Sequence, residues 1–415
     1  MGEIKTYKTN SQLYYSLIFV IILSCTPLLR NVMGYILSWL ILLPLVLSKI
    51  NSRSFTENSG VITCSLLFIA INLVYRIFGI STAQPGYYLG LLLFFMIVMI
   101  LPLVPKSIDK RKQHKLWWIL MIVMLFNVAD NIRLSILYPE INTMRFYLDK
   151  SFLSSINAGD DSFYTFSLFF FCVCFFIWLN VEQKKVKWFS LIVAVITAVY
   201  ICWYCFKASI VLFFLLSVFL IFYAKKTTHL MLFFVITAIS AIISFFLLEV
   251  YSETIVDYII SVSPNRRLTV RLVTLLDENA DEAQANTVTG RTTLYMLSIK
   301  TWLTNIVTFF VGIGDHYTVL HAAKTGIGQH ADLPDTLARY GIVGFSVIIM
   351  MLRNCIKYIL SLFDQKYRLQ VLTIFMIYII YGCVKIIFFA GVGCALFILL
   401  PLSSIFLKRN KTEKK

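Results

Sequence analysis

Charged residues are scarce in this sequence. Asp, Glu, Lys and Arg make up 14% of its 415 residues, whereas 59% are hydrophobic. A soluble protein of this composition would expose large apolar patches to water. Apolar runs of about 16 to 20 residues recur along the chain, and each is long enough to cross a hydrocarbon core of roughly 30 Å. The composition excludes a soluble protein and predicts an all-α, polytopic membrane protein with about twelve transmembrane helices.

Acidic residues are the scarcer of the two charge types, with 21 against 37 Lys and Arg, which gives a formal charge of +16. The basic residues form no single patch, so no nucleic-acid partner is predicted. They fall between alternate apolar runs, as orientation signals do in membrane proteins. Both termini are therefore predicted in the cytoplasm. The predicted spans lie near 13–29, 32–48, 61–80, 87–104, 117–136, 163–181, 188–206, 208–223, 230–249, 341–359, 369–385 and 387–407.

Cysteine is missing from the longest polar segment, residues 250–340, because all nine cysteines lie in or beside apolar runs. No disulfide framework is therefore predicted. Cys202 and Cys205 have Cys-x-x-Cys spacing inside an apolar helix, which favours membrane-buried thiols over a redox or zinc site. The histidine and acidic residues of the polar segment have irregular spacings that match no zinc signature. The sequence predicts no metal site.

The hydropathy pattern divides the chain into three parts. Residues 1–249 form a predicted N-terminal bundle of about nine helices, and residues 250–340 a large extracytoplasmic loop with short helices. Residues 341–415 form about three further transmembrane helices and a basic cytoplasmic tail. Within the loop, residues 302–314 are apolar but too short to span, which predicts an interfacial or re-entrant helix.

The long loop is rich in cations for a segment outside the membrane. One interpretation is a solvated surface, and the other is a site for an anionic, phosphate-bearing ligand, to which arginine offers paired donors. Arg266, Arg267 and Arg339 are the candidate ligand contacts in the loop. Arg76 lies inside the predicted span 61–80, where it either contacts a lipid phosphate or extends to the surface.

The end of the loop, residues 330–344, carries the most informative pattern. Asp332 and Pro334 predict a helix start, because proline is tolerated in the first turn of a helix. His330 would then stand at a helix N-terminus, where unpaired N–H groups and the helix dipole favour anions. The alternative is a capped helix that leads into a membrane span, with a histidine that only hydrogen-bonds.

This segment resembles the O-antigen ligase and Wzy polymerase superfamily, whose members end a large periplasmic loop with a histidine, a polar residue, leucine and a Gly-x-x-Gly helix entry. The corresponding residues are His330, Asp332, Leu333, Leu337, Gly341 and Gly344. Arg291, in Gly-Arg-Thr-Thr-Leu-Tyr, and the Gly-rich turn 312–314 resemble two further family elements. At the family's Ser-Arg pair this chain has Lys207 after a phenylalanine, and lysine lacks the paired donors of arginine.

The resemblance implies an inverting, metal-independent glycosyltransferase that joins oligosaccharide repeat units carried on undecaprenyl pyrophosphate. It implies that Arg291 stabilises the pyrophosphate, helped by Arg266, Arg267 or Lys207. It also implies that His330 acts as the base for the acceptor hydroxyl or orients it.

The resemblance extends to localisation and partners. It implies a multi-pass protein of the bacterial cytoplasmic membrane with its long loop outside. Arg76, Asp332 and Arg339 are predicted to help bind the donor and acceptor glycans. No cofactor is implied. The expected partners are the lipid bilayer, both lipid-linked oligosaccharides, a chain-length regulator and a flippase.

Three alternatives stay open at this level. A ligase of the same superfamily would pass finished glycan to a different acceptor. A flippase or other transporter belongs to another class, and the long outer loop and carboxylate-poor spans disfavour it. A non-catalytic membrane scaffold would leave the order of arginine and histidine in the loop unexplained.

Overall fold

The computed structural model contains helices, turns and connections, and no β-strand occurs in the part of the chain that it describes. The described residues are 11–26, 32–49, 59–81, 85–137, 161–204, 208–224, 288–315, 327 and 331–407. The predicted span 230–249 lies outside them. The all-α class of the prediction is confirmed for the described residues, whereas the count of about twelve spans stays a prediction.

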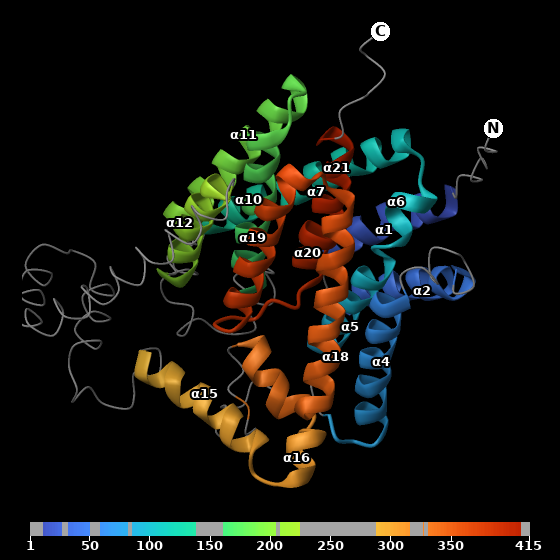
Figure 1. Ribbon diagram of the computed structural model, residues 1–415, viewed down its shortest axis with the longest axis vertical. Helices are drawn as coiled ribbons and strands as arrows, with labels where there is room; N and C mark the ends of the chain where they lie inside the picture. Colours follow the sequence, from blue (N-terminus) through green and yellow to red (C-terminus); the bar gives the residue numbers. More distant parts are fainter. Residues whose placement is uncertain are drawn as a thin grey trace, which may run out of the picture.

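Among the described residues, five stretches are long and apolar enough to cross a membrane (Figure 1). They are α4 (Ser59–Ile77), α7 (Lys110–Leu137), α11 (Lys184–Val199) with its π-helical end η1 (Tyr200–Tyr204), α18 (Asp332–Leu362), and the run α20 (Ala390–Gly393), η3 (Cys394–Leu399) and α21 (Leu400–Leu407). Shorter helices accompany them: α1 (Ser11–Cys25), α2 (Val32–Lys49), α5 (Pro85–Ile100), α6 (Leu103–Ser107), α10 (Asp161–Asn180), α12 (Ala208–Tyr223), α15 (Val288–Trp302), α16 (Ile306–Phe310) and α19 (Gln365–Gly382).

The centre of the bundle is formed by helices that are apolar on every side. All side chains of 91–100 in α5 and of 164–177 in α10 are buried. A helix without a polar face has no side to turn to water, so it packs at the centre. The outer helices expose apolar residues instead, such as Leu67 of α4 and Val195 of α11. This distribution is compatible with a membrane-embedded protein.

Several hydroxyl side chains inside the bundle bond to the backbone of their own helix. Ser65 Oγ donates to the Val61 carbonyl at 2.9 Å, and Thr197 Oγ1 donates to the Val193 carbonyl at 2.8 Å. A hydroxyl that bonds four residues back needs no partner on another helix. Short polar residues are therefore tolerated within these apolar helices.

The helix α18 connects the two ends of the bundle. Figure 1 shows α15 and α16 at the lower end, and the end of α21 and the turn between α10 and α11 at the upper end. The predicted inner segment 182–187 and the helices of the predicted outer loop thus lie at opposite ends. Which face of a membrane each end occupies stays a prediction.

The structure changes the predicted boundaries in the C-terminal third. Residues 302–314 are not one helix, because α15 ends at Trp302 and only the five residues of α16 follow before a turn. The predicted span 387–407 begins as a helix at Ala390. The predicted span 341–359 lies inside α18, which starts nine residues earlier, at Asp332, where the Asp and Pro pattern predicts a helix start.

The helix α18 is kinked at Gly341, whose φ of 60° and ψ of −169° are not helical. At this point the turn after α16 crosses it. The Ile313 N–H donates to the Ala338 carbonyl at 2.9 Å, and the Gly314 N–H donates to the Arg339 carbonyl at 2.8 Å. The kink thus leaves two carbonyls of α18 to accept hydrogen bonds from the turn. We call this contact the glycine crossing.

The crossing is too close for side chains on the glycines. A Cβ atom built on Gly341 would lie 2.3 Å from the Phe310 carbonyl, and one on Gly312 would lie 2.5 Å from the Arg339 carbonyl. The sequence identifies Gly341 only as part of a Gly-x-x-Gly helix entry. In the structure, its close contact is with the α16 turn.

Gly341→Ala is expected to destabilise the protein strongly. The backbone conformation of Gly341 is one that only glycine adopts readily, and occupying it costs about 1–3 kcal/mol before the clash with Phe310 is counted. Gly79→Ala isolates the strain, because Gly79 has a φ of 69° but no atom within 4 Å of the built Cβ. Gly90→Ala, whose nearest contact is 3.4 Å, is the neutral control. The melting temperature in detergent should be lowest for Gly341→Ala, intermediate for Gly79→Ala and highest for Gly90→Ala. Equal melting temperatures for all three would contradict the crossing.

Candidate functional site

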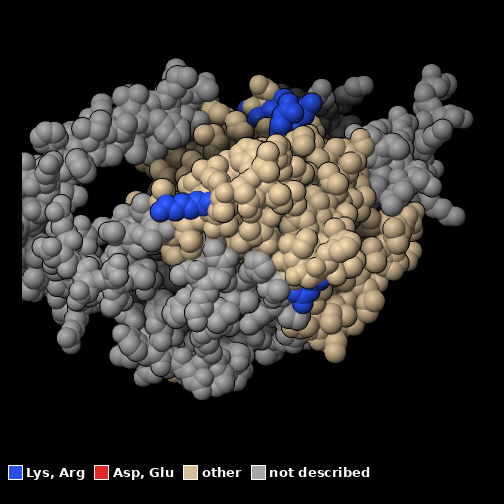
Figure 2. All heavy atoms as spheres, turned by 90° about the horizontal axis from the view of Figure 1, so that it is seen from below, with Lys and Arg blue, Asp and Glu red and all other residues tan. Residues whose placement is uncertain are grey.

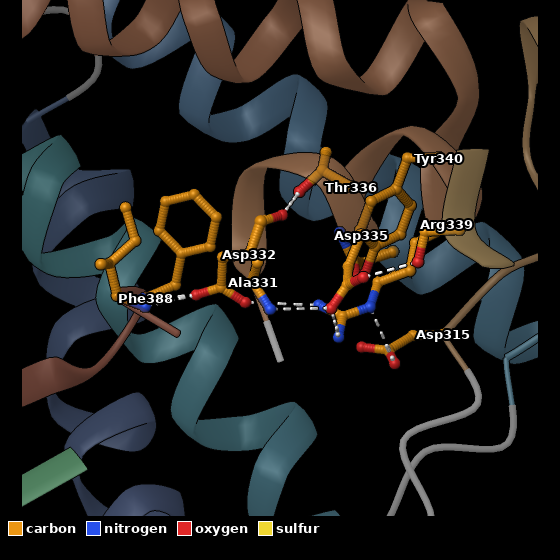
Figure 3. Close-up of polar contacts among 11 residues, drawn as sticks. Asp315, Ala331, Asp332, Asp335, Thr336, Arg339, Tyr340 and Phe388 are labelled. Carbon is orange, nitrogen blue, oxygen red and sulfur yellow. Dashed lines mark hydrogen bonds and ion pairs between the residues drawn. The ribbon is translucent and has the colours of Figure 1, made fainter. Parts of the chain in front are cut away.

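Four charged side chains lie buried together at the start of α18. They are Asp315, Asp332, Asp335 and Arg339, and none is more than 1% exposed. Figure 3 shows the Arg339 guanidinium turned toward the carboxylates. Charged side chains are almost never fully buried unless they are paired. We call this group the acid–arginine cluster.

Arg339 faces all three carboxylates of the cluster. Its Nη1 lies 3.4 Å from Asp332 Oδ1, its Nε lies 3.7 Å from Asp315 Oδ1, and its Nη2 lies 3.9 Å from Asp335 Oδ2. A guanidinium carries five N–H donors in a rigid plane, so one arginine can serve several acceptors in different directions. The cluster is therefore organised around a single cation.

Asp332 fastens the connection between α19 and α20 to the start of α18. Its Oδ2 accepts hydrogen bonds from the N–H groups of Ile387 at 2.6 Å and Phe388 at 2.9 Å. Its own N–H donates to the Lys385 carbonyl at 3.3 Å. The connection is not helical at Ile387 and Phe388, so its N–H groups need acceptors elsewhere, and a buried carboxylate provides them.

Asp335 fastens α15 to α18. Ser298 of α15 donates through Oγ to Asp335 Oδ1 at 2.6 Å, and the Ala331 N–H donates to Asp335 Oδ2 at 3.2 Å. Tyr295, one turn earlier in α15, donates through its hydroxyl to the Val384 carbonyl at 3.4 Å. The helix α15 is thus held against both the start of α18 and the connection between α19 and α20.

The end of α4 completes the surroundings of the cluster. Ser81 Oγ donates to the Asp315 carbonyl at 2.8 Å, and the Tyr75 hydroxyl donates to the Val311 carbonyl. The Tyr340 hydroxyl, next to Arg339, donates to Asn72 Oδ1 at 2.7 Å. The cluster and the glycine crossing therefore join four segments that are distant in the sequence.

The structure brings together two of the residues that the sequence assigns to substrate binding, Asp332 and Arg339. Both are buried and face each other, so they organise the surrounding backbone. Arg76 lies apart from them in the last turn of α4 and is exposed. It donates from Nη1 to the Ser81 carbonyl at 3.2 Å, and its guanidinium lies 5.7 Å from the centre of the Tyr88 ring.

The remaining predicted residues are described in part or not at all. Arg291 lies in the first turn of α15. His330, Arg266, Arg267 and Lys207 lie outside the described residues.

The sequence patterns do not assign Asp335 or Ser298 to a site. One signal was available, because Asp332, Asp335 and Arg339 are spaced three and four residues apart and so lie on one face of a helix. The partnership of Ser298 with Asp335 joins positions 37 residues apart and has no local signature.

At the lower end of the bundle, the described surface exposes basic side chains, and the carboxylates of the acid–arginine cluster are buried. Seen from that end, the described surface shows several basic side chains and no acidic one (Figure 2). Among the residues described, no three His, Cys, Asp or Glu side chains are arranged to hold a metal ion.

The sequence was compared with models of protein families and with curated proteins. No family model and no curated protein matches this chain. The chemistry of the site is therefore inferred from its residues and geometry.

Proposed function

We propose that the protein is a polysaccharide polymerase that joins undecaprenyl-pyrophosphate-linked repeat units of an O-antigen, capsule or exopolysaccharide. The observation that carries this proposal is the packing of α15 against the start of α18 through Ser298 and Asp335. The first helix carries the Gly-Arg-x-x-x-Tyr element, and the second follows directly on the His-x-Asp element. Two sequence elements that resemble the polymerase superfamily are thus neighbours at one end of the bundle.

Arg291 is proposed to bind the pyrophosphate. It precedes Tyr295 by four residues and so lies on the same face of α15, the face that meets the connection between α19 and α20. An arginine there offers paired donors to phosphate oxygens. The predicted anion site at the N-terminus of α18 is occupied by the buried carboxylates of Asp332 and Asp335, so the pyrophosphate contact falls to Arg291.

His330 is proposed to act on the acceptor. Two peptide units separate it from Asp332, so the two Cα atoms lie within about 7 Å of each other. Asp332 is fixed by its bonds to Ile387 and Phe388. In this proposal the acid–arginine cluster positions the catalytic groups and does not touch the substrate.

The proposed reaction is a direct displacement. The acceptor hydroxyl oxygen attacks the anomeric carbon, the bond from that carbon to the phosphate oxygen breaks, and undecaprenyl pyrophosphate leaves with the bonding electrons. His330 takes the hydroxyl proton, and Arg291 stabilises the charge on the leaving group. A single displacement inverts the anomeric centre. Pyrophosphate is already a competent leaving group, so positioning and charge stabilisation supply most of the catalysis.

Deletion of the gene in its host separates the rival functions. Loss of a polymerase leaves surface glycan of single repeat units, whereas loss of a ligase leaves polymer on the lipid carrier. Loss of a flippase leaves single units on the cytoplasmic side. Gel electrophoresis of surface and lipid-linked glycan distinguishes these outcomes. Normal polymer length on the cell surface of the deletion strain would rule out the proposal.

Arg291→Lys is expected to reduce polymer extension about 10- to 100-fold at normal expression. Lysine keeps the charge but replaces two parallel hydrogen bonds with one point contact, and a charge-assisted hydrogen bond contributes about 1.5–3 kcal/mol. Lys300→Ala, which removes an exposed cation from the other end of α15, should extend glycan normally. The measurement is the glycan length distribution in the complemented deletion strain. Full polymer length with both Arg291→Lys and Arg291→Ala would remove Arg291 from the site.

A further inference from the structure

The corner between α15 and α18 presents an apolar surface that the described chain does not cover. We define the α16 corner as residues 300–311. Five of its apolar side chains are between 41% and 74% exposed: Leu303, Ile306, Val307, Phe310 and Val311. No charged residue occurs from 301 to 314. An exposed apolar surface of this kind indicates a contact with an apolar partner.

Several polar groups of the corner form hydrogen bonds within it. The Asn305 side chain accepts a hydrogen bond from the Thr308 N–H at 2.9 Å, and the Asn305 N–H donates to Thr308 Oγ1 at 3.1 Å. Thr304 Oγ1 donates to the Lys300 carbonyl at 2.9 Å, and Trp302 Nε1 donates to the Phe309 carbonyl at 2.9 Å. A capping box of this kind also occurs in helices exposed to water. In hydrocarbon, where no water can act as a hydrogen-bond partner, these internal bonds lower the cost of placing the corner.

The corner lies beside the end of a candidate membrane span. The Tyr75 hydroxyl, in the last turn of α4, donates to the Val311 carbonyl. The following residues Ile77 and Phe78 are 78% and 74% exposed. The corner is therefore attached to the end of α4, which exposes large apolar side chains of its own.

Cations border this surface. Lys300 is exposed in the last turn of α15, and Arg76 is exposed in the last turn of α4. An apolar face bordered by basic residues is the pattern of a segment that lies in the membrane interface, with side chains among acyl chains and cations near lipid phosphates.

We infer that the α16 corner is inserted into the lipid leaflet at its end of the bundle, with acyl chains covering Ile306, Val307 and Phe310 and lipid phosphates near Lys300 and Arg76. The occupant of this surface is bilayer lipid. The exposed apolar side chains, the lack of charge from 301 to 314 and the contact with the end of the candidate span α4 favour lipid over water, and the bordering cations match lipid phosphate. This inference does not depend on the proposed enzymatic function.

Site-directed spin labelling in nanodiscs of phosphatidylethanolamine and phosphatidylglycerol tests the inference. Nitroxides are attached to Ile306→Cys and Phe310→Cys, with Lys300→Cys as the matched position at the border. The exposed Cys202 and Cys383, together with Cys205, are first changed to serine. Collision rates are measured with oxygen, which concentrates in hydrocarbon, and with a water-soluble nickel chelate.

At positions 306 and 310, the collision rate with oxygen should exceed that with the nickel chelate. At position 300, the collision rate with the chelate should be the higher one. Chelate-dominated collisions at 306 and 310 would mean that the corner faces water and would overturn the inference. Low collision rates with both reagents at 306 and 310 would mean that protein covers the corner, and would overturn it equally. Gel filtration of each labelled protein checks that the fold is kept.

Discussion

His330→Asn is expected to slow glycan extension about 10²–10⁴-fold while binding of the lipid-linked donor stays near normal, because that is the usual cost of losing a general base. Asparagine can hydrogen-bond and can cap a helix, but it cannot accept a proton near pH 7. The substitution therefore separates a chemical role of His330 from a structural one. Purified protein in liposomes, supplied with lipid-linked repeat units, gives both the extension rate and the donor affinity.

The control for this experiment is His114→Asn. His114 lies near the start of α7, and its ring centroid is 5.0 Å from that of Phe406 in α21. Figure 1 shows α21 and α15 toward opposite ends of the bundle. The His114→Asn protein should extend glycan at the normal rate. If His330→Asn also worked at the normal rate, His330 would be a structural residue and the base would have to be found elsewhere.

Arg339→Met is expected to lower the free energy of unfolding by about 3–5 kcal/mol, the usual cost of removing one partner from a buried ion pair. The substitution keeps much of the side-chain volume and removes the cation that faces Asp315, Asp332 and Asp335. The buried carboxylates would then repel one another in a medium that screens poorly. Chemical or thermal unfolding in detergent, followed by circular dichroism, measures the loss.

Two variants make this result specific to the buried cluster. Arg133→Met breaks the ion pair between Arg133 Nε and Asp130 Oδ1, which are 2.8 Å apart. The Arg133 side chain is 58% exposed, so the loss of stability should stay below about 1 kcal/mol. Asp315→Asn, added to Arg339→Met, removes one excess negative charge and should recover part of the lost stability. An Arg339→Met protein as stable as Arg133→Met would show that the cluster does not hold the fold together.

The sequence predicts those features whose causes are local. Apolar runs predict the helices because a helix that crosses a hydrocarbon core needs about 20 apolar residues. The start of α18 at Asp332 follows from an acidic residue and a proline in one turn. The extent of α15 could not be predicted, because residues 289–293 are threonine, glycine and arginine and show no helical periodicity. Its contacts with α18 compensate for that weak propensity.

The arrangement of the site depends on contacts between distant segments. Nothing near Gly341 indicates that it meets Phe310, and nothing near Asp332 indicates that it accepts hydrogen bonds from Ile387. Such contacts arise when helices pack, and their residues carry no local pattern. The sequence could therefore name Asp332 and Arg339 as important without indicating that they face each other.

The glycine crossing has a consequence for how such a protein can diversify. Its hydrogen bonds run between main-chain atoms of Ile313, Gly314, Ala338 and Arg339, so they do not depend on the identity of the neighbouring side chains. Substitutions at Val311 or Ile313 can reshape the surface beside α15 while the backbone framework stays in place. A backbone framework of this kind tolerates changes of the side chains beside it, provided that the glycines at 312 and 341 are kept.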